Sequence, residues 1–495
     1  MASMAERSTF CPARRRRFVL VASILASAMA FIDGSVVAIA VPAIRADLDA
    51  TLVEIQWINN AYLLALSALI LAGGAAGDAF GLRRVFLGGI GVFTLASILC
   101  AAAPDPVFLT FARVVQGIGA AFMVPLSLAL ISKAYPREER GKAIGIWAAA
   151  SALTTAAGPI LGGALLGLGP DWAWRLVFAI NLPVGIVAFA MLWLLVPPDE
   201  PGGESHPDWA GAVLATIALG LLAWALTGPG GEHGGGPSAM HTLGWGAASL
   251  VVLGLFLWRQ TRAEHPMMPL HLFTRPGFSA ANISTFLLYA ALGAVLFFLP
   301  MTLIAGHDVP EAQAGLIFIP LTAFVALLSG PVGGLVERFG AGLLIGAGSI
   351  LVAIAFGILG LFLGPFGFWG GAFPAMVVMG LGMGIVVAPL SAAVMGAVED
   401  DDSGAASGIN NTVSRIAGLV AVAALGGLVG AAFDAAGGVS LPTGFGEAPQ
   451  DASEAALRTA HDAGFAVVAW TACALAAASA AIAFLRLPVG RQPSP

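Results

Sequence analysis

Long apolar stretches separated by short polar segments run through almost the whole chain. Fourteen of them, each of about twenty residues, are centred near residues 29, 65, 93, 119, 154, 185, 218, 250, 291, 322, 352, 383, 418 and 475. A helix needs about twenty apolar residues to cross a hydrocarbon core of roughly 30 Å. Lipid offers no hydrogen-bond partners to the backbone, and the short alternating segments of a membrane barrel do not occur here. The pattern therefore predicts an all-α polytopic membrane protein with fourteen transmembrane helices.

The charges predict how these helices are oriented. Only 10% of residues are charged, and 17 of the 22 Lys and Arg residues fall on one side if the N-terminus is cytoplasmic. The opposite side then has Arg45, Arg175 and Arg458, and two further arginines lie within spans. Because positive charge collects on the cytoplasmic side, we expect both termini in the cytoplasm. The Arg- and Ala-rich, Lys-poor composition is typical of a GC-rich bacterial genome, so we expect a multi-pass protein of the bacterial inner (plasma) membrane.

A repeated pattern divides the chain into halves. Gly74, the acid Asp78 and Phe80-Gly81 follow the second stretch, and Gly333, the acid Glu337 and Phe339-Gly340 follow the tenth at an offset of 259 residues. Two six-helix bundles flanking two additional central helices would explain this offset, and such repeats are typical of secondary transporters. The expected segments are a cytoplasmic N-terminus (1–17), an N-terminal six-helix bundle (18–196), a linker with two extra transmembrane helices (197–276), a C-terminal six-helix bundle (277–486) and a cytoplasmic tail (487–495).

Motifs of catalysis and cofactor binding do not occur. The sequence holds no HExxH pair, no Ser/His/Asp set and no Gly-rich phosphate loop with a Lys, and its three cysteines form no CxxC. We therefore expect no enzyme activity, no cofactor, no metal site and no nucleic-acid partner. The expected partners are a small-molecule substrate, protons and the lipid bilayer. The sequence does not indicate whether a periplasmic adaptor binds.

One carboxylate stands alone inside the first apolar stretch. Asp33 lies fifteen residues after Phe18, and an ionised Asp near the middle of a bilayer costs roughly 2.5–3.5 kcal/mol. At 1.5 Å per residue it lies about 22 Å from the cytoplasmic end, and Arg113 lies about 9 Å below the outer end of the fourth stretch. In a core of roughly 30 Å the two are at similar depth. We expect Asp33 to handle protons with Arg113 as its modulator; a static ion pair or a helix–helix hydrogen bond is the structural alternative.

Four motifs carry a family resemblance over residues 18–486. They are Asp33 followed by a β-branched stretch to Pro42; Arg113-Val-Val-Gln116-Gly117; Gly145, Thr154, Gly158-Pro159 and Gly162-Gly163; and Gly74, Asp78, Gly81, Arg83 and Arg84 with the second copy Gly333, Glu337 and Arg338. Together they resemble the fourteen-span drug:proton antiporter branch of the major facilitator superfamily. The sequence departs from that pattern at Thr154, where a Gly is usual, and at Ala79, where an Arg usually follows the acid.

The resemblance implies a role for each motif. Asp33 and Arg113 would couple protons, and the motif from Gly145 to Gly163 would seal the interface between the halves of an exporter. Asp78 would latch one conformation by meeting a helix N-terminus of the other half. Candidates for the substrate cavity, chosen as polar residues in or near spans, are Asn59, Asn60, Tyr62, Gln116, Asn282, Tyr289, Asn411 and Arg415.

The expected function is proton-coupled secondary transport that exports small amphipathic compounds by alternating access. Two alternatives stay open: a dedicated exporter of a single metabolite or natural product, and a non-transporting membrane sensor with a transporter fold. Apart from Asp33, no acid lies well inside a span. This scarcity favours few exchanged protons and keeps neutral, zwitterionic and anionic substrates open.

Overall fold

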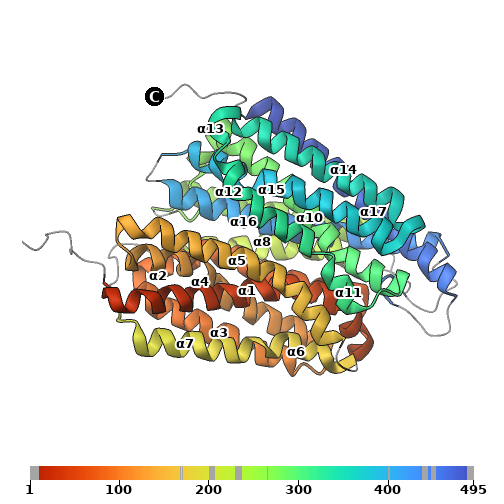
Figure 1. The fold of residues 1–495 in the computed structure, drawn as a ribbon, viewed down its shortest axis with the longest axis horizontal. Coiled ribbons are helices and arrows are strands. Elements are labelled where there is room, and N and C mark those ends of the chain that lie inside the picture. The colour runs from red at the N-terminus through yellow and green to blue at the C-terminus, as the bar shows by residue number, and fades with distance from the viewer. Residues whose placement is uncertain are drawn as a thin grey trace, which may run out of the picture.

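The structure is a computed structural model, and it describes residues 10–167, 169, 171–199, 207–228, 237–264, 266–399, 402–437, 444–447 and 453–487. Within these residues all regular secondary structure is helical, which confirms the predicted all-α membrane fold. The long helices run side by side along the longest axis in two bundles, with the first half of the chain in one and the second half in the other (Figure 1). Helix α1 begins and α17 ends at the same end of the molecule (Figure 1).

The N-terminal bundle holds the helices up to Leu195. They are α1 (Ala13–Leu48), α2 (Leu52–Phe80), α3 (Leu82–Ala101), α4 (Pro106–Ala134), α5 (Arg137–Leu166), the short turn η1 (Asp171–Ala173), α6 (Trp174–Ala179) and α7 (Asn181–Leu195). Polar caps set several of the boundaries. Thr51 accepts from the backbone N–H of Glu54, whose carboxylate accepts from the N–H of Thr51, and Asp105 accepts from the N–H of Phe108.

Two helices follow before the C-terminal bundle, α8 (Trp209–Thr227) and α9 (Ala239–Arg262). They pair as a hairpin held by Asp208, which caps α8 through Gly211 and binds Arg259 and Gln260 of α9. Burial raises the pKa of the Asp208 carboxyl, but the hydrogen bonds from Gly211, Gln260 and Arg259 outweigh burial and hold that pKa below its usual value.

The C-terminal bundle starts after the turn η2 (Leu270–Thr274). It holds α10 (Pro276–Met301), the π-turn η3 (Thr302–Gly306), α11 (Glu311–Leu316), α12 (Ile319–Gly333), α13 (Val336–Phe339), α14 (Ala341–Gly367), the π-turn η4 (Phe368–Ala372), α15 (Phe373–Gly396), α16 (Ser403–Ala435) and α17 (Glu454–Arg486). Helix α8 lies between the two bundles in Figure 1 and packs against α2 and α16.

Twelve helical stretches of the described residues are long and apolar enough to cross a membrane. One of these, Ala341–Gly396, contains both α14 and α15, and of α5 the segment Ala157–Leu166 is found as a shorter apolar helix outside the twelve. The count of fourteen spans and the division at residues 197 and 276 therefore stay predictions.

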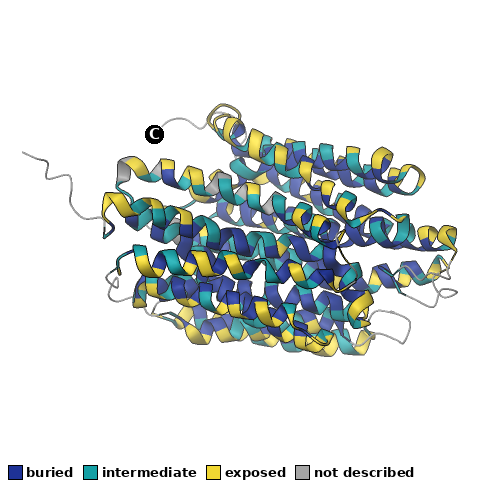
Figure 2. Ribbon diagram, turned by 60° about the horizontal axis from the view of Figure 1, so that its bottom comes forward, coloured by how far each residue is buried: buried dark blue, intermediate teal, exposed yellow. Residues whose placement is uncertain are grey.

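The buried core shows where the bundles meet. Its larger part combines the C-terminal bundle with the ends of the N-terminal helices that are predicted to face outward, including Ile44, Ile58 and Phe178. A smaller part, including Met29, Leu66 and Phe86, contains residues of the N-terminal bundle alone, toward the end predicted to face the cytoplasm. Exposed residues mostly lie on the helix faces that point away from the interior of the molecule (Figure 2). The two halves are therefore packed together at the end predicted to face outward, and an apolar core of this extent closes that end of the molecule.

Candidate proton and substrate site

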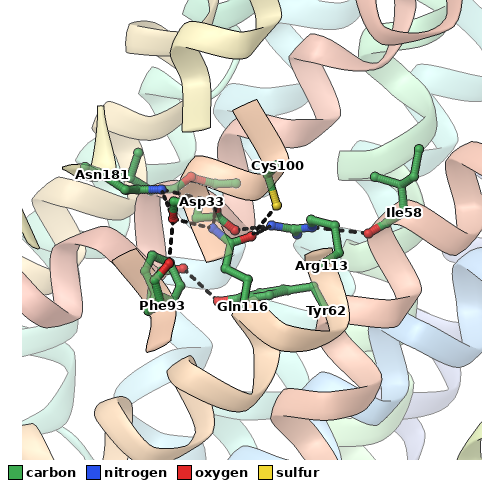
Figure 3. Close-up of polar contacts among 12 residues, drawn as sticks. Asp33, Ile58, Tyr62, Phe93, Cys100, Arg113, Gln116 and Asn181 are labelled. Carbon is green, nitrogen blue, oxygen red and sulfur yellow. Dashed lines mark hydrogen bonds and ion pairs between the residues drawn. The ribbon is translucent and has the colours of Figure 1, made fainter. Parts of the chain in front are cut away.

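Asp33 lies at the centre of a buried polar network inside the N-terminal bundle. Its side chain is fully buried in α1, and its Oδ2 forms an ion pair with Nη1 of Arg113 from α4. Its Oδ1 accepts a hydrogen bond of 2.8 Å from Nε2 of Gln116. Figure 3 shows these side chains converging on the carboxylate. The structure thus brings together the two residues that depth along the helices placed at one level.

Two further residues, which the sequence did not indicate, complete this network. Asn181, at the start of α7, donates to Oδ1 of Asp33 at 3.4 Å and to Oγ of Ser97 at 3.3 Å. Ser97 of α3 also accepts from Nε2 of Gln116 at 2.9 Å and donates to the carbonyl of Phe93 at 2.8 Å. Helices α1, α3, α4 and α7 are therefore joined at one point around a single carboxylate.

Arg113 has several contacts besides Asp33. Its Nη1 donates to Oε1 of Gln116 at 2.7 Å, and its Nε donates to the carbonyl of Ile58 at 3.2 Å. The guanidinium carbon lies 4.2 Å from the centre of the Tyr62 ring and 5.7 Å from that of Phe178, within the range of a cation–π contact. Its Nη2 is buried without a hydrogen-bond partner. The arginine is thus held by one charge and by several weaker groups.

A cavity of about 290 Å³ lies where the halves meet. Helices α1, α2 and α5 line one side and α10, α12 and α16 line the other, so both bundles contribute to its wall. Most of the lining is apolar, and its polar side chains are Ser35, Asn59, Thr322 and Arg415. A concave, mainly apolar pocket with a few placed polar groups is the usual form of a small-molecule site.

Glycines bring α5 into contact with both halves beside this cavity. A Cβ on Gly158 would lie 3.0 Å from the carbonyl oxygen of Ile32 in α1, and one on Gly315 of α11 would lie 2.5 Å from the carbonyl oxygen of Pro159. A Cβ on Gly163 would lie 3.1 Å from the carbonyl carbon of Glu311 and 3.0 Å from the Cα of Ala312, both in α11. No side chain fits at these crossings, so the glycines are what allow the outer contact to form.

Comparison with known proteins identifies the family. A family model described as Major Facilitator Superfamily matches residues 23–422. The chain belongs to the Major Facilitator Superfamily. It is 35% identical over 420 residues to the cephamycin export protein CmcT of Amycolatopsis lactamdurans, covering 82% of this chain and 83% of that protein. It is 32% identical over 433 residues to the multidrug resistance protein Stp of Mycobacterium tuberculosis (strain CDC 1551 / Oshkosh), covering 84% and 76%.

Solved structures of this superfamily have the same fold. A bacterial homologue of the human lysosomal transporter Spinster, inward-facing and unoccupied, matches with a TM-score of 0.69 at 19% identity and covers 96% of this chain and 97% of that one. The inward-open xylose transporter XylE from E. coli matches with a TM-score of 0.62 at 14% identity, with coverage of 96% and 97%. The chain is therefore a multi-pass membrane transporter of small-molecule substrates with the major facilitator fold.

The other residues of the motif from Gly145 to Gly163 have fewer contacts with neighbouring helices. A Cβ on Gly145 would meet nothing within 4 Å, and Gly162 abuts Val36 of α1. The hydroxyl of Thr154 donates to the carbonyl of Ser151 at 3.0 Å, a bond within α5. Among the glycines of the motif, Gly158, Gly162 and Gly163 thus lie against other helices, and Gly145 does not.

The loop motif between α2 and α3 differs from the expected latch. Asp78 is exposed, and the described part of the chain gives it no hydrogen bond or ion pair with the other half. The N-terminus of α3 is instead capped by Asp199, which the sequence did not single out. Its carboxylate accepts hydrogen bonds from the backbone N–H groups of Leu82 and Arg83 at 3.0 and 2.9 Å. It also accepts one from Nζ of Lys133 at 3.0 Å. Because Asp199 comes from the end of the same bundle, this contact braces one half and does not join two.

The remaining residues of the loop motif and its second copy lie at the surface or at turns. Gly81 has a φ of 93°, which a glycine adopts without strain, and it separates α2 from α3. Arg83 donates to the carbonyls of Leu192 and Trp193, whereas Arg84 is exposed. The remaining members have few contacts: a Cβ on Gly74 would meet nothing within 4 Å, one on Gly333 would reach the Cβ of Ala388 at 3.5 Å, and Glu337 and Arg338 are exposed.

The cavity candidates divide into two groups. Asn59 and Arg415 line the cavity, and Asn411 accepts a hydrogen bond of 3.2 Å from Nε of Arg415. The others are not part of the wall. Gln116 and Tyr62 surround Arg113, and Asn60 is buried in α2, where it accepts a hydrogen bond of 3.4 Å from Asn59. Asn282 bonds Phe278 and Asn410, and Tyr289 packs against the larger core. The structure therefore places Asn59 and Arg415 in the cavity wall and joins Asn411 to Arg415, whereas the remaining five candidates are not part of the wall.

Proposed function

We propose that this protein is a proton-driven exporter of small amphipathic compounds, located in a bacterial plasma membrane with both termini in the cytoplasm. Its relatives are named for export of, and resistance to, antibiotics and drugs. The distribution of Lys and Arg supports the orientation. The observation that carries proton coupling is the environment of Asp33.

All polar groups around the Asp33 carboxylate are donors. Arg113 donates to Oδ2, and the side-chain amides of Gln116 and Asn181 donate to Oδ1. A hydrogen on either oxygen would point at a donor, so protonation of Asp33 would displace at least one of these groups. Protonation would also leave Arg113 buried without a counter-charge, which costs several kcal/mol. Proton binding to Asp33 and a rearrangement of Arg113 are therefore coupled.

Arg113 has groups that can hold it when Asp33 is protonated. The carbonyl of Ile58 and the rings of Tyr62 and Phe178 already contact the guanidinium, and Nη2 has no partner in the present arrangement. In the proposed cycle, the ionised pair accompanies the conformation closed at the outer end, as here. Opening outward exposes Asp33 to protons from outside while substrate leaves, and return to the closed form releases the proton to the cytoplasm.

The test compares proton coupling with exchange. Everted vesicles with a pH-sensitive dye report proton movement driven by a panel of amphipathic compounds, and radiolabelled substrate counterflow reports exchange without a proton gradient. We expect Asp33→Asn to abolish compound-induced proton release and retain counterflow. Asp47→Asn is the matched control, because Asp47 lies at the outer end of the same helix and pairs with Arg175. Proton release in Asp33→Asn equal to wild type would refute the proposal.

A further inference from the structure

The central cavity carries one unbalanced charge. Among its lining residues Arg415 of α16 is the only ionisable one, and no Asp or Glu belongs to the wall. The single hydrogen bond of the Arg415 side chain runs from Nε to the amide oxygen of Asn411. No carboxylate of the described residues lies within ion-pair distance of it, and none of the described residues forms a hydrogen bond with its Nη groups.

The contrast with Arg113 shows that this is not a shared feature of the buried arginines. Arg113 is neutralised by Asp33, and Asp33 is saturated by Arg113, Gln116 and Asn181. Asp33 is fully buried and does not line the cavity, so it offers no anionic surface to a bound cation. Of the three charges in this part of the bundle, two cancel and Arg415 remains.

An uncompensated guanidinium inside a membrane protein is costly, because its charge has lost water without gaining a counter-ion. A ligand that brings an anion into the cavity recovers part of that cost. The planar fork of Arg suits carboxylates in particular, since it donates two parallel hydrogen bonds to the two oxygens. A bound monovalent cation would instead be repelled by Arg415 at close range.

The other lining residues indicate which kind of ligand skeleton the cavity can hold. Phe31, Leu63, Leu296, Phe297, Phe318 and Leu321 present aromatic and aliphatic side chains, and Asn59 and Thr322 add neutral polar groups. The volume of about 290 Å³ lies at the small end of the range for drug-sized ligands, roughly 300–1,000 Å³. A compact aromatic or aliphatic skeleton with one acidic group matches both the wall and the charge.

We infer that the transported compounds are amphipathic organic anions whose carboxylate binds Arg415 while their apolar body fills the cavity between the bundles. This inference rests on the proposed export function and names its substrate class.

The experiment uses three compounds with one skeleton: naphthaleneacetic acid, its methyl amide, and 2-naphthylethylamine. Binding to the purified full-length protein in lipid nanodiscs is measured by calorimetry at neutral pH. We expect the acid to bind at least tenfold more tightly than the amine. Arg415→Gln is expected to lower affinity for the acid at least tenfold and leave the amide unchanged, with Arg415→Lys in between. Thr322→Val, a cavity variant without a change in charge, should keep the preference for the acid.

Three results would overturn the inference: equal binding of acid and amine, equal loss of acid and amide binding in Arg415→Gln, or binding of none of the three compounds. Monodisperse elution of each variant and an unchanged affinity for the amide exclude misfolding. Proton release in everted vesicles distinguishes this inference from the proposed function. Coupled export of a cation with no preference for acids would refute the anion site and leave proton antiport standing. Arg415-dependent binding of the acid without proton release would refute proton antiport and leave the anion site standing.

Discussion

A methyl group on Gly163 should shift the transporter toward its outward-open conformation. The Cβ of Gly163→Ala would lie 3.0 Å from the Cα of Ala312 and 3.1 Å from the carbonyl carbon of Glu311. Carbon atoms normally approach to about 3.5–4.0 Å, so α11 must move away by roughly 0.5–1 Å. Overpacking of this kind costs about 1–3 kcal/mol. The cost falls on the outer-closed form alone, so the population of the open form should rise roughly 5- to 150-fold.

The assay follows access to the cavity from outside. In a cysteine-free background, Thr322→Cys places a thiol in the cavity wall, and a membrane-impermeant maleimide labels it in right-side-out vesicles. We expect Gly163→Ala to accelerate labelling and Gly145→Ala to leave it unchanged, because a Cβ on Gly145 meets nothing within 4 Å. Both substitutions add the same methyl group to the same helix. Unchanged labelling in Gly163→Ala, or equal acceleration in both, would show that the α5–α11 contact does not close the outer end.

Two more predictions concern the outer contact and the added hairpin. Arg45 of α1 binds the carbonyl of Phe445 and the carboxylate of Glu447, so Arg45→Gln should weaken outer closure by about 1.5–3 kcal/mol and speed the same labelling. Arg175→Gln, whose lost bonds lie within the N-terminal bundle, should not. Asp208→Asn should lower unfolding free energy by about 1–3 kcal/mol at neutral pH. Because the folded pKa of Asp208 lies below its usual value, this difference in thermal unfolding should persist above about pH 4 and shrink as pH falls further; a constant difference would contradict it.

Much of the fold follows from the sequence because lipid restricts the alternatives. Runs of about twenty apolar residues must be helices, and the rise of 1.5 Å per residue places side chains of different helices at comparable depth. That is why Asp33 and Arg113 could be paired before the structure was known. Both cost energy when alone in a membrane, so each required a partner at its own level.

Residues that cost little when buried were harder to recognise. Ser97 can satisfy its own hydroxyl by bonding the carbonyl of Phe93 one turn earlier, so nothing in the sequence demands a distant partner. Asn181 follows the break between α6 and α7, and only packing of α7 against α1 and α3 turns its amide toward Asp33. Asp199 lies in a Pro-rich loop, and its return to the N-terminus of α3 is a tertiary contact that no local pattern encodes.

The rotation of each helix about its axis was the other unknown. Asn59 and Leu63 are four residues apart and share the face that lines the cavity, whereas Asn60 is turned by about 100° and is buried in the bundle. A span that is apolar all round carries little pattern to show which face meets its neighbours. Polar residues in the correct span were therefore identified, and only some of them face the cavity.

The two proposed sites together explain how one buried acid can drive export. When one organic anion leaves and one proton enters, the net charge moved is equivalent to two positive charges entering the cytoplasm. At about 2.3 kcal/mol per charge per 100 mV, this exchange gains about 4.6 kcal/mol from a membrane potential of 100 mV, negative inside. Exchange of a monovalent cation for one proton moves no net charge and gains nothing from the potential. A transporter of cations therefore benefits from a second proton and a second acid, whereas an exporter of anions with Arg415 in its cavity needs only Asp33.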